Sequence, residues 1–128
     1  MSNTELQEHI AFAEWLRYKG IPFFHPANGG KRSIIQATLL KKMGVLPGVP
    51  DFIILKAPKG YRGIAIEMKR AVGNSTVSAS QKAVMSMMSH EGWLVFVAYG
   101  FANAKKYIEG LEPFYKMPDW DAGPPSKI

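Results

Sequence analysis

The chain has 128 residues, 47% of them hydrophobic, which indicates one folded domain with a substantial core rather than a disordered chain. It contains no cysteine, which excludes disulfide bonds and thiolate metal sites and is compatible with a reducing, intracellular setting. The formal net charge of +6 at pH 7 favours a polyanionic partner such as nucleic acid, although many basic proteins bind none.

The first predicted element is a helix over Thr4 to Lys19, because apolar residues recur there at helical spacing. Glu5 in its first turn suits the positive end of the helix dipole, and Gly20 ends it. The apolar run Ile21 to His25 predicts a short strand. His25 has three interpretations at this point: a plain strand residue, a metal ligand or a phosphate contact.

A loop over Pro26 to Arg32 follows, and its glycines expose backbone N–H groups beside Lys31 and Arg32. Such a loop could grip phosphate, but a plain flexible turn explains the same residues equally well. A second helix is predicted over Ser33 to Met43, with Ser33 as its N-cap. The apolar side of this helix consists of Ile35, Leu39 and Leu40.

The segment Gly48 to Lys69 has the pattern of a β-hairpin, in which two short apolar runs flank a polar turn at residues 57–62. Asp51 precedes the first strand, and Glu67 and Lys69 lie near the end of the second. Because side chains alternate along a strand, Glu67 and Lys69 point to the same side. The hairpin can therefore bring two acids and a lysine together at one edge of a sheet.

Two carboxylates at such an edge can hold a hard divalent cation, and a lysine beside them can orient a water or offset charge on a phosphate. The simpler interpretation is a solvated strand face, which is what a lone Glu-x-Lys pair usually indicates. That interpretation explains less well why Asp51 follows Gly48, which permits a sharp turn, and Pro50, which suits the first position of a strand.

A third helix is predicted over Ser78 to Glu91, where Ser78-Ala-Ser-Gln81 has the form of a capping box and gives Gln81 a structural role. Trp93 to Ala98 is an unbroken apolar run, as expected for an inner strand buried on both faces. The helical link before it resembles a crossover, which would make this strand parallel to the second hairpin strand. Ala102 to Gly110 is predicted as the last helix.

The fold class is therefore α/β, with a mixed central sheet and flanking helices. Residues 1–111 form the predicted domain, and residues 112–128, with four prolines, form an irregular tail. The polar start shows no signal peptide, and the longest apolar run, Trp93 to Ala102, is too short to span a bilayer. We expect a cytoplasmic protein without a membrane segment.

Several motifs together resemble the VRR-NUC domains of the PD-(D/E)xK nuclease superfamily. The motifs are the Asn28-Gly-Gly-Lys-Arg32 loop, the run from Leu40 to Asp51, Glu67-Met-Lys69 and Ser80-Gln81. Each alone is weak, but their order and spacing over nearly the whole chain are specific. The resemblance implies a restriction-endonuclease-like αβββαβ core with an extra helix inserted before the catalytic hairpin.

The resemblance also implies a Mg²⁺ or Mn²⁺ ion held by two acids of the hairpin, with the lysine next to the attacking water. The implied catalytic residues are Asp51, Glu67, Lys69 and Gln81, of which Asp51 and Glu67 bind the metal. The family's first-helix acid corresponds best to Glu5, as a further metal ligand, with Glu8 as the substitute. A glutamine often follows one turn later, where this chain has His9. Expected DNA contacts are His25, Asn28, Lys31, Arg32 and Arg70.

The implied activity is metal-dependent hydrolysis of DNA phosphodiester bonds. The small free-standing members that the chain resembles look like phage enzymes that form homodimers and cut branched DNA, such as four-way junctions. Candidate dimer surfaces are the inserted helix, Phe23 and Phe24, and the tail with Phe114, Tyr115 and Trp120. Two alternatives stay open: a non-catalytic DNA-binding module with the same fold and, with little support, a small-molecule or interaction protein.

Overall fold

The computed structural model describes residues 3–27, 32–73 and 75–114 of the chain. The elements are α1 (Asn3–Tyr18), β1 (Phe23–Phe24), α2 (Ile34–Lys42), β2 (Phe52–Ile54), β3 (Ile64–Lys69), α3 (Ala79–His90), β4 (Leu94–Tyr99) and α4 (Phe101–Leu111). This order confirms the predicted α/β class, with α2 as the extra helix before the hairpin. The tail beyond residue 114 lies outside the described residues. No described helix is long and apolar enough to cross a membrane.

The strands form one four-stranded mixed sheet in the order β1-β2-β3-β4. β2 pairs antiparallel with both β1 and β3, and Phe52 lies opposite Ile66, so the predicted hairpin is present. β3 and β4 are parallel, with Glu67 opposite Val97. A parallel pair needs a long connection, and α3 provides it, which confirms the predicted crossover.

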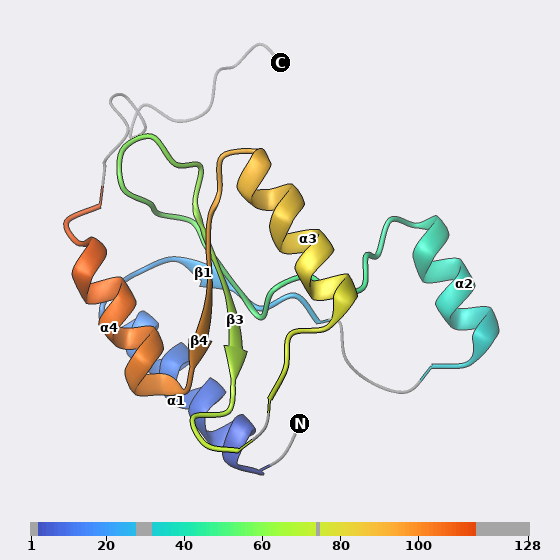
Figure 1. The fold of residues 1–128 in the computed structure, drawn as a ribbon, viewed down its shortest axis with the longest axis horizontal. Helices are drawn as coiled ribbons and strands as arrows, with labels where there is room; N and C mark the ends of the chain where they lie inside the picture. The colour runs from blue at the N-terminus through green and yellow to red at the C-terminus, as the bar shows by residue number, and fades with distance from the viewer. Residues whose placement is uncertain (1–2, 28–31, 74, 115–128) are drawn as a thin grey trace.

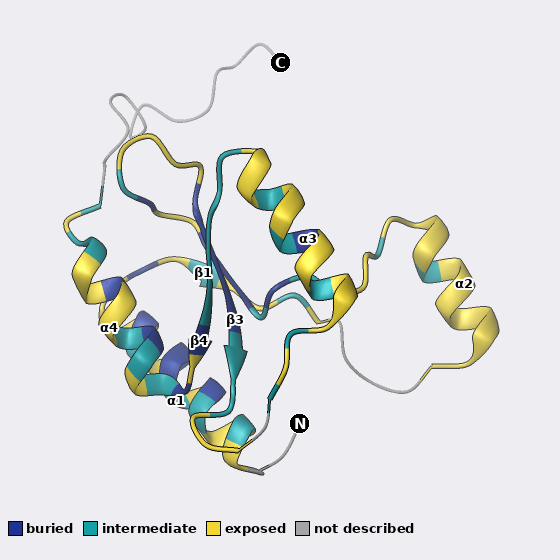
Figure 2. Cartoon of the chain, viewed as in Figure 1, coloured by how far each residue is buried: buried dark blue, intermediate teal, exposed yellow. Residues whose placement is uncertain are grey.

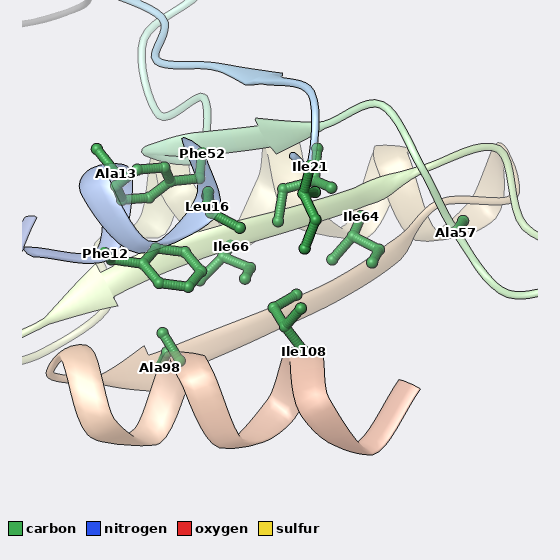
Figure 3. Close-up of a cluster of buried hydrophobic side chains, with 12 residues drawn as sticks. Phe12, Ala13, Leu16, Ile21, Phe52, Ala57, Ile64, Ile66, Ala98 and Ile108 are labelled. Carbon is green, nitrogen blue, oxygen red and sulfur yellow. The ribbon is translucent and has the colours of Figure 1, made fainter. Parts of the chain in front are cut away.

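Helices cover both faces of the sheet, with α1 and α4 on one side and α3 on the other (Figure 1). The core lies between the sheet and the layer of α1 and α4 (Figure 3). Phe12 and Leu16 of α1 and Ile108 of α4 pack there with Ile64 and Ile66 of β3, and all five side chains are fully buried. Burying each such side chain contributes roughly 1.5–3 kcal/mol, so this layer holds the hairpin firmly in place.

The start of α3 is set by the predicted capping box. The N–H of Gln81 donates to Ser78 Oγ, and the N–H of Ser78 donates to Gln81 Oε1. Ser33 and Gln36 form the same arrangement at the start of α2. Each capping box satisfies two backbone N–H groups that the first turn of a helix would otherwise leave without partners.

The turn before Asp51 lies directly against the start of α3. Gly48 has a φ of +92°, and a Cβ at this position would lie 2.5 Å from the backbone oxygen of Ser80. We expect Gly48→Ala to lower the free energy of unfolding by more than about 1 kcal/mol, because the new methyl group meets backbone at a left-handed φ. Denaturant unfolding measures this loss. Gly44→Ala is the matched control, since Gly44 also has a positive φ but open space around it. An equal loss in both variants would contradict the proposed clash.

β4 differs from the inner strand expected for Trp93 to Ala98. It lies at the edge of the described sheet, and most of its residues are only half-buried. The run is apolar because helices cover both faces: Phe96 stacks on Tyr107 of α4 at 4.7 Å, and α3 lies against the opposite face (Figure 1). A run of apolar residues indicates that both faces of a strand are covered. It does not indicate whether another strand pairs with the edge of that strand.

α2 stands apart from the rest of the domain (Figure 1), and none of its residues, all of them described, is buried (Figure 2). On the predicted apolar side, Ile35 is 73% exposed and Leu39 is 54% exposed. Ile34 and Met43 add further exposed apolar surface. In the single chain, this helix therefore presents an apolar face to solvent.

Candidate functional site

Asp51 and Glu67 face each other at one end of the hairpin strands. Phe52 pairs with Ile66, so the antiparallel register places Asp51 opposite Glu67 at the next position. The backbone N–H of Met68 donates to Asp51 Oδ2 at 2.8 Å, which holds the carboxylate against the end of β3. The structure therefore brings the two predicted hairpin acids together.

Glu67 is a buried carboxylate, with only 4% of its surface exposed. Burial first, and the charge of Asp51 second, raise the pKa of Glu67 to about 7, against the opposing effect of Lys69. The negative charge of the two acids is therefore only partly offset by the protein itself. A cation that binds both carboxylates would remove this repulsion.

Lys69 lies on the same side of β3 as Glu67, as the alternation of side chains predicts. Its Nζ donates to Gln81 Oε1 at 3.0 Å and lies 3.4 Å from Glu67 Oε2. Gln81 Nε2 donates to the same Glu67 oxygen at 2.8 Å. Gln81 Oε1 also accepts the N–H of Ser78, so one side chain connects the helix cap to the buried carboxylate.

The raised pKa of Glu67 gives the metal-free protein a defined pH dependence. Between the ordinary value of 4.5 and about 7, the folded state binds more protons than the unfolded state, so stability falls as pH rises through this window. We expect the melting temperature in chelator to drop by several degrees from pH 5 to pH 8, and less in Glu67→Gln. Parallel thermal unfolding of the two proteins measures the difference. Identical pH slopes would contradict a raised pKa at this residue.

The two predicted first-helix acids do not join this pair. Glu5 Oε1 lies 3.1 Å from Arg70 Nε in an ion pair at the end of β3. Glu8 Oε1 accepts the N–H of Phe101 at 3.4 Å, at the start of α4, where a negative charge suits the helix dipole. Neither acid belongs to the group of metal-ligating side chains that the described residues form around Asp51.

α1 instead contributes His9 to the neighbourhood of Asp51. One ligand atom from each of His9, His25 and Asp51 lies within 4.8 Å of the other two. Burial lowers the pKa of His9, and the neighbouring His25 lowers it further against the opposing charge of Asp51, so the net shift favours the neutral ring. Sequence reasoning does not identify His9 as a site residue. The available signal is its position one turn after Glu5, where the resembled family often has glutamine.

The residues predicted to contact DNA differ in whether the structure describes them and in whether they are exposed or paired. Asn28 and Lys31 lie outside the described residues. Arg32 is exposed just before α2, whereas Arg70 pairs with Glu5. Arg32 is therefore open to a phosphate in the present conformation, and Arg70 would have to share or leave its carboxylate partner.

The acid pair fits a hard divalent cation. Asp51 and Glu67 offer oxygen ligands, which Mg²⁺ and Mn²⁺ prefer, and Mg²⁺ needs few protein ligands because it keeps several waters. Burial first, and the charge of Asp51 second, raise the pKa of Glu67, so a cation bound here would stabilise its charged form. The donor set and the charge both suit such an ion.

Asp51, Glu67, Lys69 and Gln81 all lie within one region of the chain that matches a known protein family. The family model of the VRR-NUC domain matches residues 4–102. A solved structure of a VRR_NUC domain protein is similar over 88% of this chain and 90% of its own, with a TM-score of 0.72 and 30% sequence identity. A search of curated proteins gives no match.

Proposed function

The chain belongs to the VRR-NUC domain family, a family of nuclease domains, and we propose that it is a metal-dependent endonuclease that hydrolyses phosphodiester bonds in DNA. The observation that carries the proposal is the partly buried network in which the buried Glu67 faces Asp51 and contacts Lys69 and Gln81. Burying a carboxylate lowers the stability of a protein. Carboxylates with strongly raised pKa values are therefore rare in general and are concentrated at functional sites.

Asp51 and Glu67 are the proposed ligands of a Mg²⁺ or Mn²⁺ ion, which would supply charge stabilisation and activation of the attacking water. Hydrolysis forms a bond between the water oxygen and phosphorus and breaks a bond between phosphorus and a sugar oxygen. The proton released from the water balances the alkoxide that leaves. The two carboxylates supply fixed negative charge, which would hold the cation on one side of the bound phosphate.

Lys69 is the proposed electrostatic catalyst. Its ammonium group can donate a hydrogen bond to the attacking water and offset charge that builds on the phosphate oxygens. Gln81 is a positioning residue, because its amide holds Lys69 at 3.0 Å and Glu67 at 2.8 Å. The further proposed DNA contacts, which lie outside this network, are His25, Asn28, Lys31, Arg32 and Arg70.

The experiment that tests the activity is a panel of labelled linear, nicked, flapped and four-way DNA with Mg²⁺, Mn²⁺ or EDTA. We expect cleavage with either metal and none in EDTA. Cleavage that persists in EDTA would overturn the metal mechanism. Salt-dependent DNA binding that survives Asp51→Ala, without cleavage of any substrate, would favour the non-catalytic binding module instead.

We further propose that the substrate is branched DNA and that the enzyme acts as a homodimer. Symmetric resolution of a four-way junction requires two cuts, and a two-fold dimer supplies two equivalent sites. The exposed apolar side of α2, with Ile35 and Leu39, supports this proposal, because large exposed apolar surfaces usually mark an interaction site.

We expect light scattering to give a mass near twice 14.2 kDa. Ile35→Glu should shift the protein toward the monomer, since a charge at 73% exposure costs little in the free chain but much in an apolar interface. Thr38→Glu, also on α2, serves as a polar-site control. A monomeric wild-type protein that still makes paired cuts in a junction would contradict the dimer as the source of symmetry.

A further inference from the structure

Two imidazoles and a carboxylate meet at the start of β2. One ligand atom from each of His9, His25 and Asp51 lies within 4.8 Å of the other two. The three residues come from separate segments: His9 from α1, His25 from the residue after β1, and Asp51 from the residue before β2. The tertiary fold therefore assembles this cluster, and no short sequence motif contains it.

The ring of His25 is anchored to the backbone of Asp51. Its Nδ1 lies 2.6 Å from the backbone carbonyl oxygen of Asp51. A carbonyl oxygen can only accept, so Nδ1 carries the proton and Nε2 keeps its lone pair in the neutral ring. A carbonyl that accepts from the other ring nitrogen is the usual support of a metal-bound histidine.

His9 is fixed by packing. Its ring centroid lies 4.3 Å from that of Phe52 and 4.5 Å from that of His25, and only 9% of the residue is exposed. A cavity of about 510 Å³, lined by residues that include His9, His25 and Phe52, lies beside the two rings. This cavity leaves room for water molecules beside the two imidazoles.

We propose that His9, His25 and Asp51 bind a transition-metal dication, with Zn²⁺ as the preferred occupant, at a site beside the hairpin acid pair. Imidazole nitrogen suits Zn²⁺, whereas Mg²⁺ prefers an all-oxygen set such as Asp51 and Glu67. Three protein ligands with an open position are the usual number at an accessible zinc site.

Asp51 belongs to both ligand sets, so the two sites are linked. Zn²⁺ on the histidine side engages the carboxylate that the proposed Mg²⁺ ligand set requires, and Zn²⁺ therefore inhibits Mg²⁺-dependent cleavage. This consequence rests on the proposed nuclease function. The binding of Zn²⁺ itself does not, and it can be measured on a protein that cuts nothing.

The test is Zn²⁺ affinity, measured by competition between the full chain and a chromogenic chelator. We expect one Zn²⁺ per chain and an affinity at least about tenfold lower in His25→Ala and in Asp51→Asn, since even residues that only support a ligand change affinity by 10- to 100-fold. His90→Ala is the matched control, because His90 is the third histidine and lies exposed at the end of α3. Equal affinity in wild type and His25→Ala overturns the proposal.

Glu67→Gln separates the two proposals. We expect it to keep wild-type Zn²⁺ affinity, because Glu67 is not in the histidine cluster. A loss equal to that of Asp51→Asn would place the ion on the acid pair and overturn the inference. Undiminished cleavage in Glu67→Gln would instead refute the assignment of the acid pair as the catalytic metal site and leave the zinc site standing.

Nitrogen NMR of the histidine rings gives a readout without substitution of the buried His9. We expect Zn²⁺ to shift the ring nitrogens of His9 and His25 and to leave those of His90 in place. In His25→Ala, the shift at His9 should be lost at the Zn²⁺ concentration that saturates wild type. A Zn²⁺ response at His90 alone would overturn the proposal.

Discussion

Asp51→Asn and Glu67→Gln should each reduce the rate of DNA cleavage by about 10³-fold or more, while the protein remains folded. The amides keep the shape of the acids: the amide oxygen at position 51 could still accept the N–H of Met68, and the one at position 67 could still accept from Gln81. What each variant removes is one negative oxygen ligand of the proposed cation. Each tenfold loss corresponds to about 1.4 kcal/mol of transition-state stabilisation, so the expected effect is about 4 kcal/mol.

Single-turnover cleavage of the best substrate, with circular dichroism of each variant, measures this effect. Glu109→Gln is the matched control, because Glu109 is an exposed acid on α4, away from the proposed network. DNA binding by the two site variants should be preserved or stronger, since an acid next to the phosphate path is neutralised. Wild-type turnover in either variant would refute the assignment of the acid pair.

Lys69→Ala should lower the saturated cleavage rate by about 10²–10³-fold, the usual effect of removing one preorganised donor from a transition state. Metal affinity should change much less, because Lys69 is not a proposed ligand. The lysine also lowers the pKa of Glu67, so its removal raises that pKa further and weakens metal binding at low pH. The comparison therefore belongs at pH 8 or above, where a larger share of Glu67 is ionised.

Calorimetric Mn²⁺ titration and the rate at saturating metal separate binding from catalysis. Lys82→Ala is the matched control, because Lys82 is an exposed lysine that follows Gln81 on α3. A large loss of Mn²⁺ affinity at pH 8, together with an unchanged saturated rate, would mean that Lys69 organises the metal ligands and does not act in the transition state.

Local sequence patterns predicted much of this fold. The hairpin could be predicted because alternation and turn residues are local signals, and the capping box of Ser78 and Gln81 spans only one helical turn. The same alternation placed Glu67 and Lys69 on one side of β3. These features need no knowledge of the remote parts of the chain.

Features that depend on distant contacts were not predictable in this way. Whether β4 has a neighbouring strand on its outer edge is decided by the whole sheet, and its apolar run is the same in either case. His9 meets Asp51 only because α1 packs across the hairpin, and the two are separated by 42 positions. Likewise, the ion pair of Glu5 with Arg70 depends on how α1 is placed beside β3.

The double role of Gln81 bears on how such domains change during evolution. Its amide closes the cap of α3 and also holds Lys69 and Glu67. Under the proposed mechanism, a descendant that lost nuclease activity would still need this glutamine for the helix cap, whereas it would no longer need the proposed catalytic role of Lys69. A retained glutamine at this position therefore says little about activity in a diverged relative. If Lys69 has the proposed role, the lysine two residues after the strand glutamate is the more informative position.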